Sequence, residues 1–198
     1  MNSNIIITQD MITKCAGFAS ASVNSSADQY ARRNQYNVKK IEKDIKVGKI
    51  GEECVYNYLV EKFPTLTKPD HNIYSKENKS WDTDLKDLDS DIRISVKTQD
   101  IEASYSWGES WVFQGNFNSK VKTDYDKEVF ENKNPNHYVA FVLLNVPKRV
   151  AIIKAIVKID WLHENDLFKL MQKQSLQGNK SAVYFEDLEK YSDQLFQL

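Results

Sequence analysis

The chain has 198 residues, of which 41% are hydrophobic and 28% charged, with a net charge of −1. This length is enough for one domain with its own core, and the composition excludes disordered and collagen-like chains. Two cysteines, Cys15 and Cys54, and three histidines cannot form a disulfide framework or a four-ligand zinc cluster. The longest apolar stretch, residues 138–144, is too short to span a membrane. We therefore predict a single cytoplasmic domain with no membrane partner.

The charges are unevenly distributed along the chain. Residues 29–50 carry seven basic and two acidic side chains, whereas residues 81–102 carry three basic and seven acidic ones. A basic segment can contact a polyanion, and an acidic segment can concentrate divalent cations. On charge alone, two solvated faces are the favoured explanation of this pattern.

A helical segment is predicted within the first half of the chain. Residues 26–63 lack proline and show an apolar stripe at helical spacing. Gly48 and Gly51 predict either a break in this helix or a close approach by another part of the backbone. Residues 65–80 are rich in turn formers and predict a loop, with one short strand at residues 72–74.

A β-hairpin is predicted next, because Ile92, Ile94 and Val96 alternate with polar residues after a turn at residues 88–91. Its first strand is expected at residues 81–87 and its second at residues 92–98. The hairpin therefore has one apolar face and one polar face.

The rest of the chain predicts further strands and two helices. We expect the aromatic side chains of Tyr105, Trp107 and Trp111 to be buried in the core. The strands are expected at residues 110–114, 138–145, 149–157 and 182–185, and the helices at residues 160–175, with Asp160 as N-cap and residues 178–179 as its end, and at residues 187–196. These elements predict an α/β fold with a central mixed β-sheet flanked by helices, in which residues 1–47 form an N-terminal helical arm and residues 48–198 form the core.

The polar face of the hairpin carries the candidate chemistry. Asp84 lies near the end of the first strand, and Ser95, Lys97 and Gln99 share one face of the second, because side chains on a strand repeat every two residues. Glu52 lies in the upstream GKIGEE segment. An exposed ion pair between Asp84 and Lys97 is the simplest alternative explanation.

These segments resemble the restriction-endonuclease-like, or PD-(D/E)xK, nuclease superfamily, which has a helix with an acid, a strand with an aspartate, a hairpin turn, and a strand with an acid-x-Lys pattern. The resemblance covers residues 48–99. It implies a restriction-endonuclease-like core and hydrolysis of phosphodiester bonds in double-stranded DNA with Mg²⁺, for which Mn²⁺ can substitute. Carboxylates hold such ions, which activate water and neutralise phosphate.

The resemblance also assigns roles to individual residues. Asp84 is then the central metal ligand, the main-chain carbonyl of Val96 is another, and Glu52 binds a second ion or its water. Lys97 orients the nucleophile or stabilises charge, and Gln99 touches the phosphate or supports the site.

The sequence departs from this pattern at Ser95, where such nucleases usually have an acid. By resemblance to restriction enzymes with serine at this position, a glutamate from a following helix supplies the missing ligand, which makes Glu109, or less readily Glu102, the candidate. Asp70, in a literal Pro-Asp pair, and Asp82 are alternatives to Asp84.

The basic segment, residues 29–50, contains a second candidate surface. Arginine suits phosphate contacts, and asparagine and glutamine suit contacts to base edges. The residues in question are Arg32, Arg33, Asn34 and Gln35. A solvated helix surface is the ordinary alternative.

We therefore predict a type II restriction-like endonuclease that acts as a homodimer on double-stranded DNA, since two sites can cut both strands. A structure-selective repair or phage recombination nuclease is one alternative. A catalytically silent nucleic-acid-binding domain of the same fold is the other. The sequence has no phosphate-binding GxxxxGK[ST] motif, so no nucleotide cofactor is expected.

Overall fold

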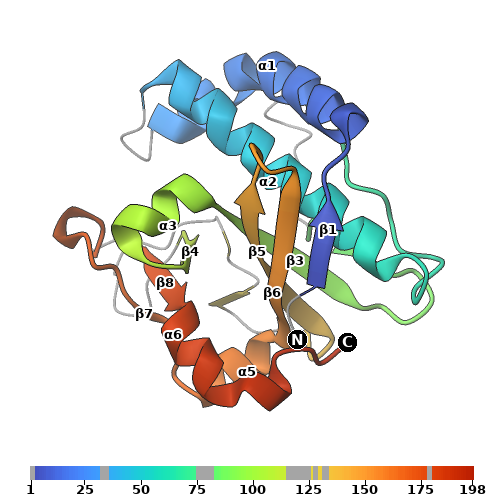
Figure 1. Cartoon of the computed structure of the whole chain (residues 1–198), viewed down its shortest axis with the longest axis vertical. Coiled ribbons are helices and arrows are strands. Elements are labelled where there is room, and N and C mark those ends of the chain that lie inside the picture. The colour runs from blue at the N-terminus through green and yellow to red at the C-terminus, as the bar shows by residue number, and fades with distance from the viewer. Residues whose placement is uncertain are drawn as a thin grey trace.

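The computed structural model describes residues 3–31, 36–74, 83–114, 126, 129–130, 134–177 and 180–198. In this part of the chain, a five-stranded mixed sheet has two long helices on one face and a smaller sheet with short helices on the other (Figure 1). This arrangement confirms the predicted α/β class with a central mixed sheet. No helix in the described part is both long and apolar enough to cross a membrane.

The central sheet has the strand order β1-β6-β5-β3-β2. Strands β3 and β5 run parallel, and the other neighbouring pairs run antiparallel. The strands are β1 (Ser3–Ile6), β2 (Leu85–Lys86), β3 (Arg93–Asp100), β5 (His137–Asn145) and β6 (Val150–Lys158). The predicted hairpin and the strands now labelled β5 and β6 are confirmed. The first hairpin strand is shorter than predicted, and Trp81 and Asp82 lie outside the described residues.

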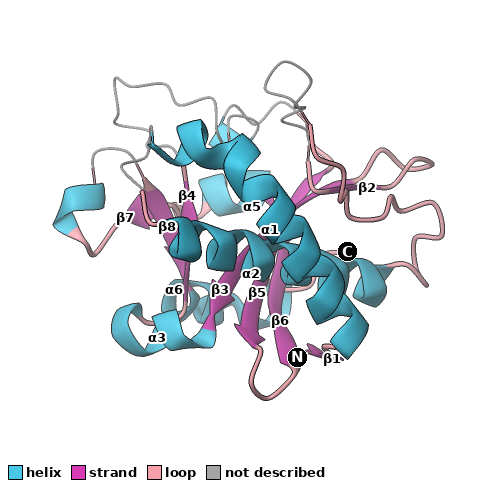
Figure 2. Ribbon diagram, turned by 90° about the horizontal axis from the view of Figure 1, so that it is seen from above, coloured by secondary structure: helices cyan, strands magenta, loops and turns pink. Residues whose placement is uncertain are grey.

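On one face of this sheet, one long helix packs against the strands and a second packs against that helix, as Figures 1 and 2 show. The helix against the strands is α2 (Val38–Leu59) and the other is α1 (Gln9–Ala31), and the side chain of Asn37 caps the start of α2 by accepting a hydrogen bond from the amide of Lys40. The predicted break at Gly48 is wrong, because α2 runs through both glycines. The predicted close approach is confirmed at Gly51, where an added Cβ would lie 1.8 Å from Thr98 Oγ1 of β3.

The second, smaller sheet has the order β4-β8-β7 and packs on the opposite face. It confirms the predicted strands at β4 and β8. The chain here forms β4 (Ser110–Phe113), β7 (Lys169–Leu170) and β8 (Ser181–Tyr184), together with α3 (Ile101–Trp107), α5 (Ile159–Glu164), α6 (Phe185–Leu188), and the 3₁₀ helices η1 (Gln174–Leu176) and η2 (Glu189–Gln194). The final pair, α6 and η2, corresponds to the helix predicted at residues 187–196.

Two predicted elements, the helix at residues 160–175 and the strand at residues 72–74, do not form as predicted. The helix predicted for residues 160–175 ends at Glu164, and Lys158 rather than Asp160 is its N-cap residue. The chain turns at Asp166, whose φ is 49°, so that Phe168 packs 5.1 Å from the ring of Phe113. Packing of this aromatic cluster overrides the local helical pattern. The short strand predicted at residues 72–74 is irregular chain, and residues 178–179 lie outside the described structure.

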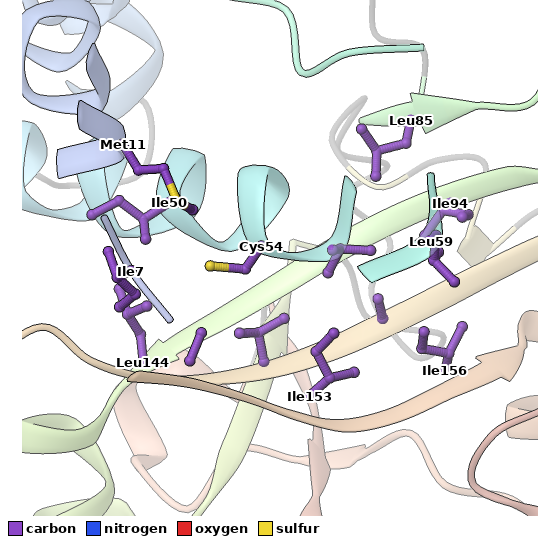
Figure 3. Close-up of a cluster of buried hydrophobic side chains, with 14 of the residues drawn as sticks. Ile7, Met11, Ile50, Cys54, Leu59, Leu85, Ile94, Leu144, Ile153 and Ile156 are labelled. Atoms are coloured by element: carbon purple, nitrogen blue, oxygen red, sulfur yellow. The ribbon is translucent and has the colours of Figure 1, made fainter. Parts of the chain in front are cut away.

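The core consists of two hydrophobic clusters, one on each side of the central sheet. Between the sheet and α2, Ile50, Cys54 and Leu59 point toward side chains of the strands, as Figure 3 shows. The cluster also includes Met11 of α1, so the N-terminal segment shares its core with the rest of the chain. On the other face, the second cluster contains Trp111 and Phe141, among others.

The prediction that three aromatic residues after the hairpin are core is right for one of them. Trp111 is buried and donates a hydrogen bond from Nε1 to the carbonyl of Val142 at 2.9 Å. Tyr105 and Trp107 are exposed on α3. They lie on a seven-residue helix with no buried residue.

The hairpin turn depends on the buried carboxylate of Asp87. It accepts hydrogen bonds from Thr65 Oγ1 at 2.6 Å and from the amide of Ser90 at 3.0 Å. Changing Asp87 to Ala leaves these donors without their acceptor and should lower the free energy of unfolding by roughly 1–3 kcal/mol. Urea unfolding at pH 7 measures the change, with the exposed turn residue Asp89→Ala as control. An equal effect in both variants would contradict this role for Asp87.

Candidate active site

The candidate site begins on α2, at the point where this helix lies closest to β3. Gly51 allows the contact with Thr98, and the next residue, Glu52, is buried. Lys49, one turn earlier on α2, forms an ion pair with Glu52 at 2.6 Å. A buried glutamate and its lysine are therefore held against the sheet by helix packing.

The hairpin supplies Asp84, which immediately precedes β2. Its Oδ2 accepts a hydrogen bond from the amide of Val96 at 2.7 Å. The amide and carbonyl of one strand residue point to the same side of the strand, so the Val96 carbonyl also faces the β2 edge of β3. Asp84 forms no ion pair with any residue in the described part of the chain.

Glu52 and Asp84 influence each other electrostatically. Burial, followed by the negative charge of Asp84, raises the pKa of Glu52 to about 8, although Lys49 acts in the opposite direction. Burial also raises the pKa of Asp84 above its usual range, against the Val96 hydrogen bond and the charges of Lys97 and Lys49. Two desolvated carboxylates thus share a region in which a positive charge would be stabilised.

Lys97 lies on the polar face of β3, as predicted, but its ion pair is not with Asp84. Its Nζ lies 2.5 Å from Oδ1 of Asp126 and 4.9 Å from the centre of the Phe113 ring. The other carboxylate oxygen of Asp126 accepts a hydrogen bond from the amide of Gln114 at 2.7 Å. The negative charge of Asp126 also acts to raise the pKa of Asp84, so Lys97 and Asp126 both influence this carboxylate.

The other polar residues of β3 are bound to neighbouring segments. Ser95 Oγ lies 2.9 Å from Nε2 of the buried His137 on β5. Gln99 donates from Nε2 to the carbonyl of Gly108, and its Oε1 accepts from the amide of Ser110. In this conformation, the Gln99 side chain fixes the start of β4 to β3.

The acids proposed to replace the missing ligand are paired elsewhere. Glu109 lies 2.8 Å from Lys154 of β6, and Glu102 lies 2.7 Å from Lys43 of α2. Asp70, the alternative in the Pro-Asp pair, accepts hydrogen bonds from the hydroxyl of Tyr74 at 2.6 Å and from the amide of Asn72 at 2.9 Å. None of these contacts brings the three acids to the Val96 carbonyl.

The residue after Glu52, Glu53, takes part in a separate group of polar contacts. Glu53 forms an ion pair with Lys14 of α1 at 2.6 Å and shares a hydrogen bond with His71 at 2.8 Å. This network joins both long helices and the following loop next to the candidate site.

The donors present suit a hard divalent cation. Mg²⁺ binds oxygen ligands, keeps several waters, and commonly takes one or two carboxylates from the protein together with substrate phosphates. Glu52, Asp84 and the Val96 carbonyl fit this requirement. The described residues contain no group of three histidine, cysteine or acidic side chains arranged to hold a metal ion.

Sequence reasoning did not identify two members of the site. Lys49 could have been found from its spacing, because a residue three positions before Glu52 shares its helix face. Asp126 carries no such signal, since it is 29 positions from Lys97 in the sequence. The candidate DNA-contacting residues, numbers 32–35, lie outside the described residues.

Comparisons with known proteins show no relative. No protein-family model matches the chain, and neither the curated proteins nor the solved structures contain a significant match.

Proposed function

We propose that the protein is a Mg²⁺-dependent endonuclease with a restriction-endonuclease-like core that hydrolyses phosphodiester bonds in double-stranded DNA. The observation that carries the proposal is the pair of desolvated carboxylates, Glu52 and Asp84, beside Lys49 and Lys97. Carboxylates for a divalent cation and ammonium groups for a phosphate are what this hydrolysis requires.

Each residue has a role in this proposal. Asp84, Glu52 and the carbonyl of Val96 hold the cation, which lowers the pKa of a bound water and neutralises charge on the phosphate. Lys97, whose charge acts on Asp84, stabilises the negative charge that develops on the phosphate oxygens. In the absence of the cation, the ion pair with Lys49 offsets part of the cost of burying the Glu52 charge.

Site-specific cleavage of the restriction type is the form we favour. It would require a homodimer to cut both strands, and cytoplasmic conditions would keep Cys15 and Cys54 as thiols. A repair or phage recombination nuclease would use the same residues on nicked or branched DNA.

One observation favours a catalytically silent binding domain instead. Ser95 stands at the position where the resembling nucleases carry an acid, so this position supplies no carboxylate. Its hydroxyl lies within hydrogen-bonding distance of His137. The two readings differ in a single property, which is cleavage.

The test is digestion of long phage DNA and supercoiled plasmid in Mg²⁺ and in EDTA. We expect cleavage that EDTA abolishes and that Lys97→Ala reduces by roughly 10²-fold or more, because a charge-stabilising donor is lost. Lys86→Ala is the matched control, since Lys86 lies on the other hairpin strand in an exposed pair with Asp91. It should cut like the unmodified protein.

The products separate the alternatives. Discrete bands support a site-specific enzyme, whereas nicking or smearing with the same metal and Lys97 dependence supports a repair or recombination role. No cleavage in Mg²⁺ or Mn²⁺ would overturn the nuclease proposal in favour of the silent domain. Equal cleavage by the Lys97→Ala protein would show that a contaminant is responsible.

A further inference from the structure

The charge of Lys97 acts on two acids, Asp84 and Asp126, but among the described residues Lys97 forms an ion pair only with Asp126. Its ammonium is 2.5 Å from Asp126, and its charge acts on Asp84 without an ion pair. Asp84 instead accepts the hydrogen bond from the Val96 amide. Among the described residues, no lysine forms an ion pair with the Asp84 carboxylate.

Asp126 is well placed to determine this choice. Its backbone φ is 50°, a conformation that aspartate tolerates, and its carbonyl accepts a hydrogen bond from the amide of Val129 at 3.1 Å. The Gln114 amide holds its second carboxylate oxygen. The ring of Phe113 lies beside the ammonium of Lys97. The ammonium is thus positioned by an acid that is itself fixed at two points.

A lysine and a divalent cation would compete for the same carboxylate. Where water is largely excluded, an ammonium bound to Asp84 would have to be displaced before a cation could bind. Glu52 already carries such a lysine, since Lys49 lies 2.6 Å away. If Lys97 paired with Asp84, both acids would be occupied by lysines.

We infer that Asp126 is a positioning residue that holds the Lys97 ammonium away from Asp84 and so keeps this carboxylate available to a divalent cation. The inference rests on the proposed function. It names the acidic partner of Lys97, which lies far from the hairpin in the sequence and is neither Glu102 nor Glu109.

Binding of Mn²⁺, followed by electron paramagnetic resonance, tests the inference without depending on catalysis. Asp126→Asn releases Lys97, and we expect the Kd for Mn²⁺ to rise roughly 10–100-fold, the usual effect of losing a group that orients a site. Adding Lys97→Met to this variant removes the competitor and should restore the wild-type Kd. Lys97→Met alone should not weaken Mn²⁺ binding, because it removes a positive charge that acts on Asp84.

A matched control is available at Asp166. It has a similar φ of 49° and forms an ion pair with Lys169 at 2.8 Å, but this pair is exposed. Asp166→Asn should change neither Mn²⁺ binding nor DNA cleavage. Asp126→Glu, which keeps the carboxylate, should bind Mn²⁺ more tightly than Asp126→Asn and guards against a variant that simply fails to fold.

The outcomes distinguish this inference from the proposed function. In cleavage assays, Asp126→Asn should lower kcat at saturating Mn²⁺ because Lys97 is no longer oriented, and the double variant should remain inactive. An unchanged Kd in Asp126→Asn would overturn the inference alone, as would failure of the double variant to recover, which would make Asp126 a ligand. A wild-type protein that binds no divalent cation would overturn the proposed function, and the inference with it.

Discussion

Glu52→Gln should make the metal-free protein more stable at pH 8, although the substitution removes an ion pair. Burial raises the pKa of Glu52 from 4.5 to about 8, so the folded state holds a proton that the unfolded state has already released. Folding stability therefore falls as the pH rises from about 4.5 to 8 and remains low above that range. At about 1.4 kcal/mol per pKa unit, the cost approaches ~5 kcal/mol.

The neutral amide avoids this cost but loses part of the attraction to Lys49. We expect Glu52→Gln to raise the free energy of unfolding by ~2–4 kcal/mol at pH 8 and to change it little at pH 4. Urea unfolding across this pH range, in buffer containing EDTA, measures the difference. A variant that is less stable than the wild type at pH 8 would show that the Lys49 ion pair outweighs desolvation.

The neighbouring Glu53 provides the matched control with the opposite sign. Burial acts to raise its pKa, but the hydrogen bonds from Lys14 and His71 outweigh burial and hold the pKa below its usual value. The stability that Glu53 contributes is therefore present at neutral pH and is lost as the pH falls through its pKa in the folded protein. Glu53→Gln should therefore destabilise the protein at pH 8. At this pH, Glu52→Gln and Glu53→Gln should shift the midpoint of urea unfolding in opposite directions.

Gly51→Ala and Gly48→Ala should also have opposite effects, although both lie in α2. A Cβ at Gly51 would lie 1.8 Å from Thr98 Oγ1 and 3.0 Å from Thr98 Cβ, so helix and strand must separate. Overpacking of this kind lowers the free energy of unfolding by ~1–3 kcal/mol. A Cβ at Gly48 meets nothing within 4 Å, and alanine should stabilise the helix there by ~0.5–1 kcal/mol.

Thermal and urea unfolding of both variants measure these effects. Adding Thr98→Ala to Gly51→Ala removes the nearest atom and should recover part of the lost stability. If Gly51→Ala were as stable as Gly48→Ala, α2 would not depend on close contact with β3. The placement of Glu52 next to the hairpin would then need another explanation.

The longer strands were predicted well because their signal is local, whereas the short strands β1 and β7 were not predicted. Alternation of Ile94 and Val96 with Ser95 and Lys97 marks one buried and one polar face, and the structure places Ile94 and Val96 toward the cluster beneath α2. Residues 138–144 of the nine-residue strand β5 are apolar, and both faces of this strand are covered by the two clusters.

Helix boundaries were predicted less well because they depend on distant contacts. The apolar residues after Glu164 fit a helix, but Phe168 packs against Phe113, about 55 positions earlier, and the chain bends to reach it. Conversely, Gly48 and Gly51 predicted either a break or a close approach of another part of the backbone, and the structure shows a continuous α2 with the close approach at Gly51.

By itself, the sequence determined the α/β class, the hairpin, and the polar face that carries Lys97, because side-chain periodicity and turn residues act between near neighbours. The roles of Asp84, Lys97 and Glu52 in DNA cleavage remain predictions. Only the tertiary structure decided that Glu52 lies beside Asp84, that Asp126 pairs with Lys97, and that Glu109 pairs with Lys154. These partners come from different elements, and which charges meet depends on how helices and sheets pack, a property that no local spacing encodes.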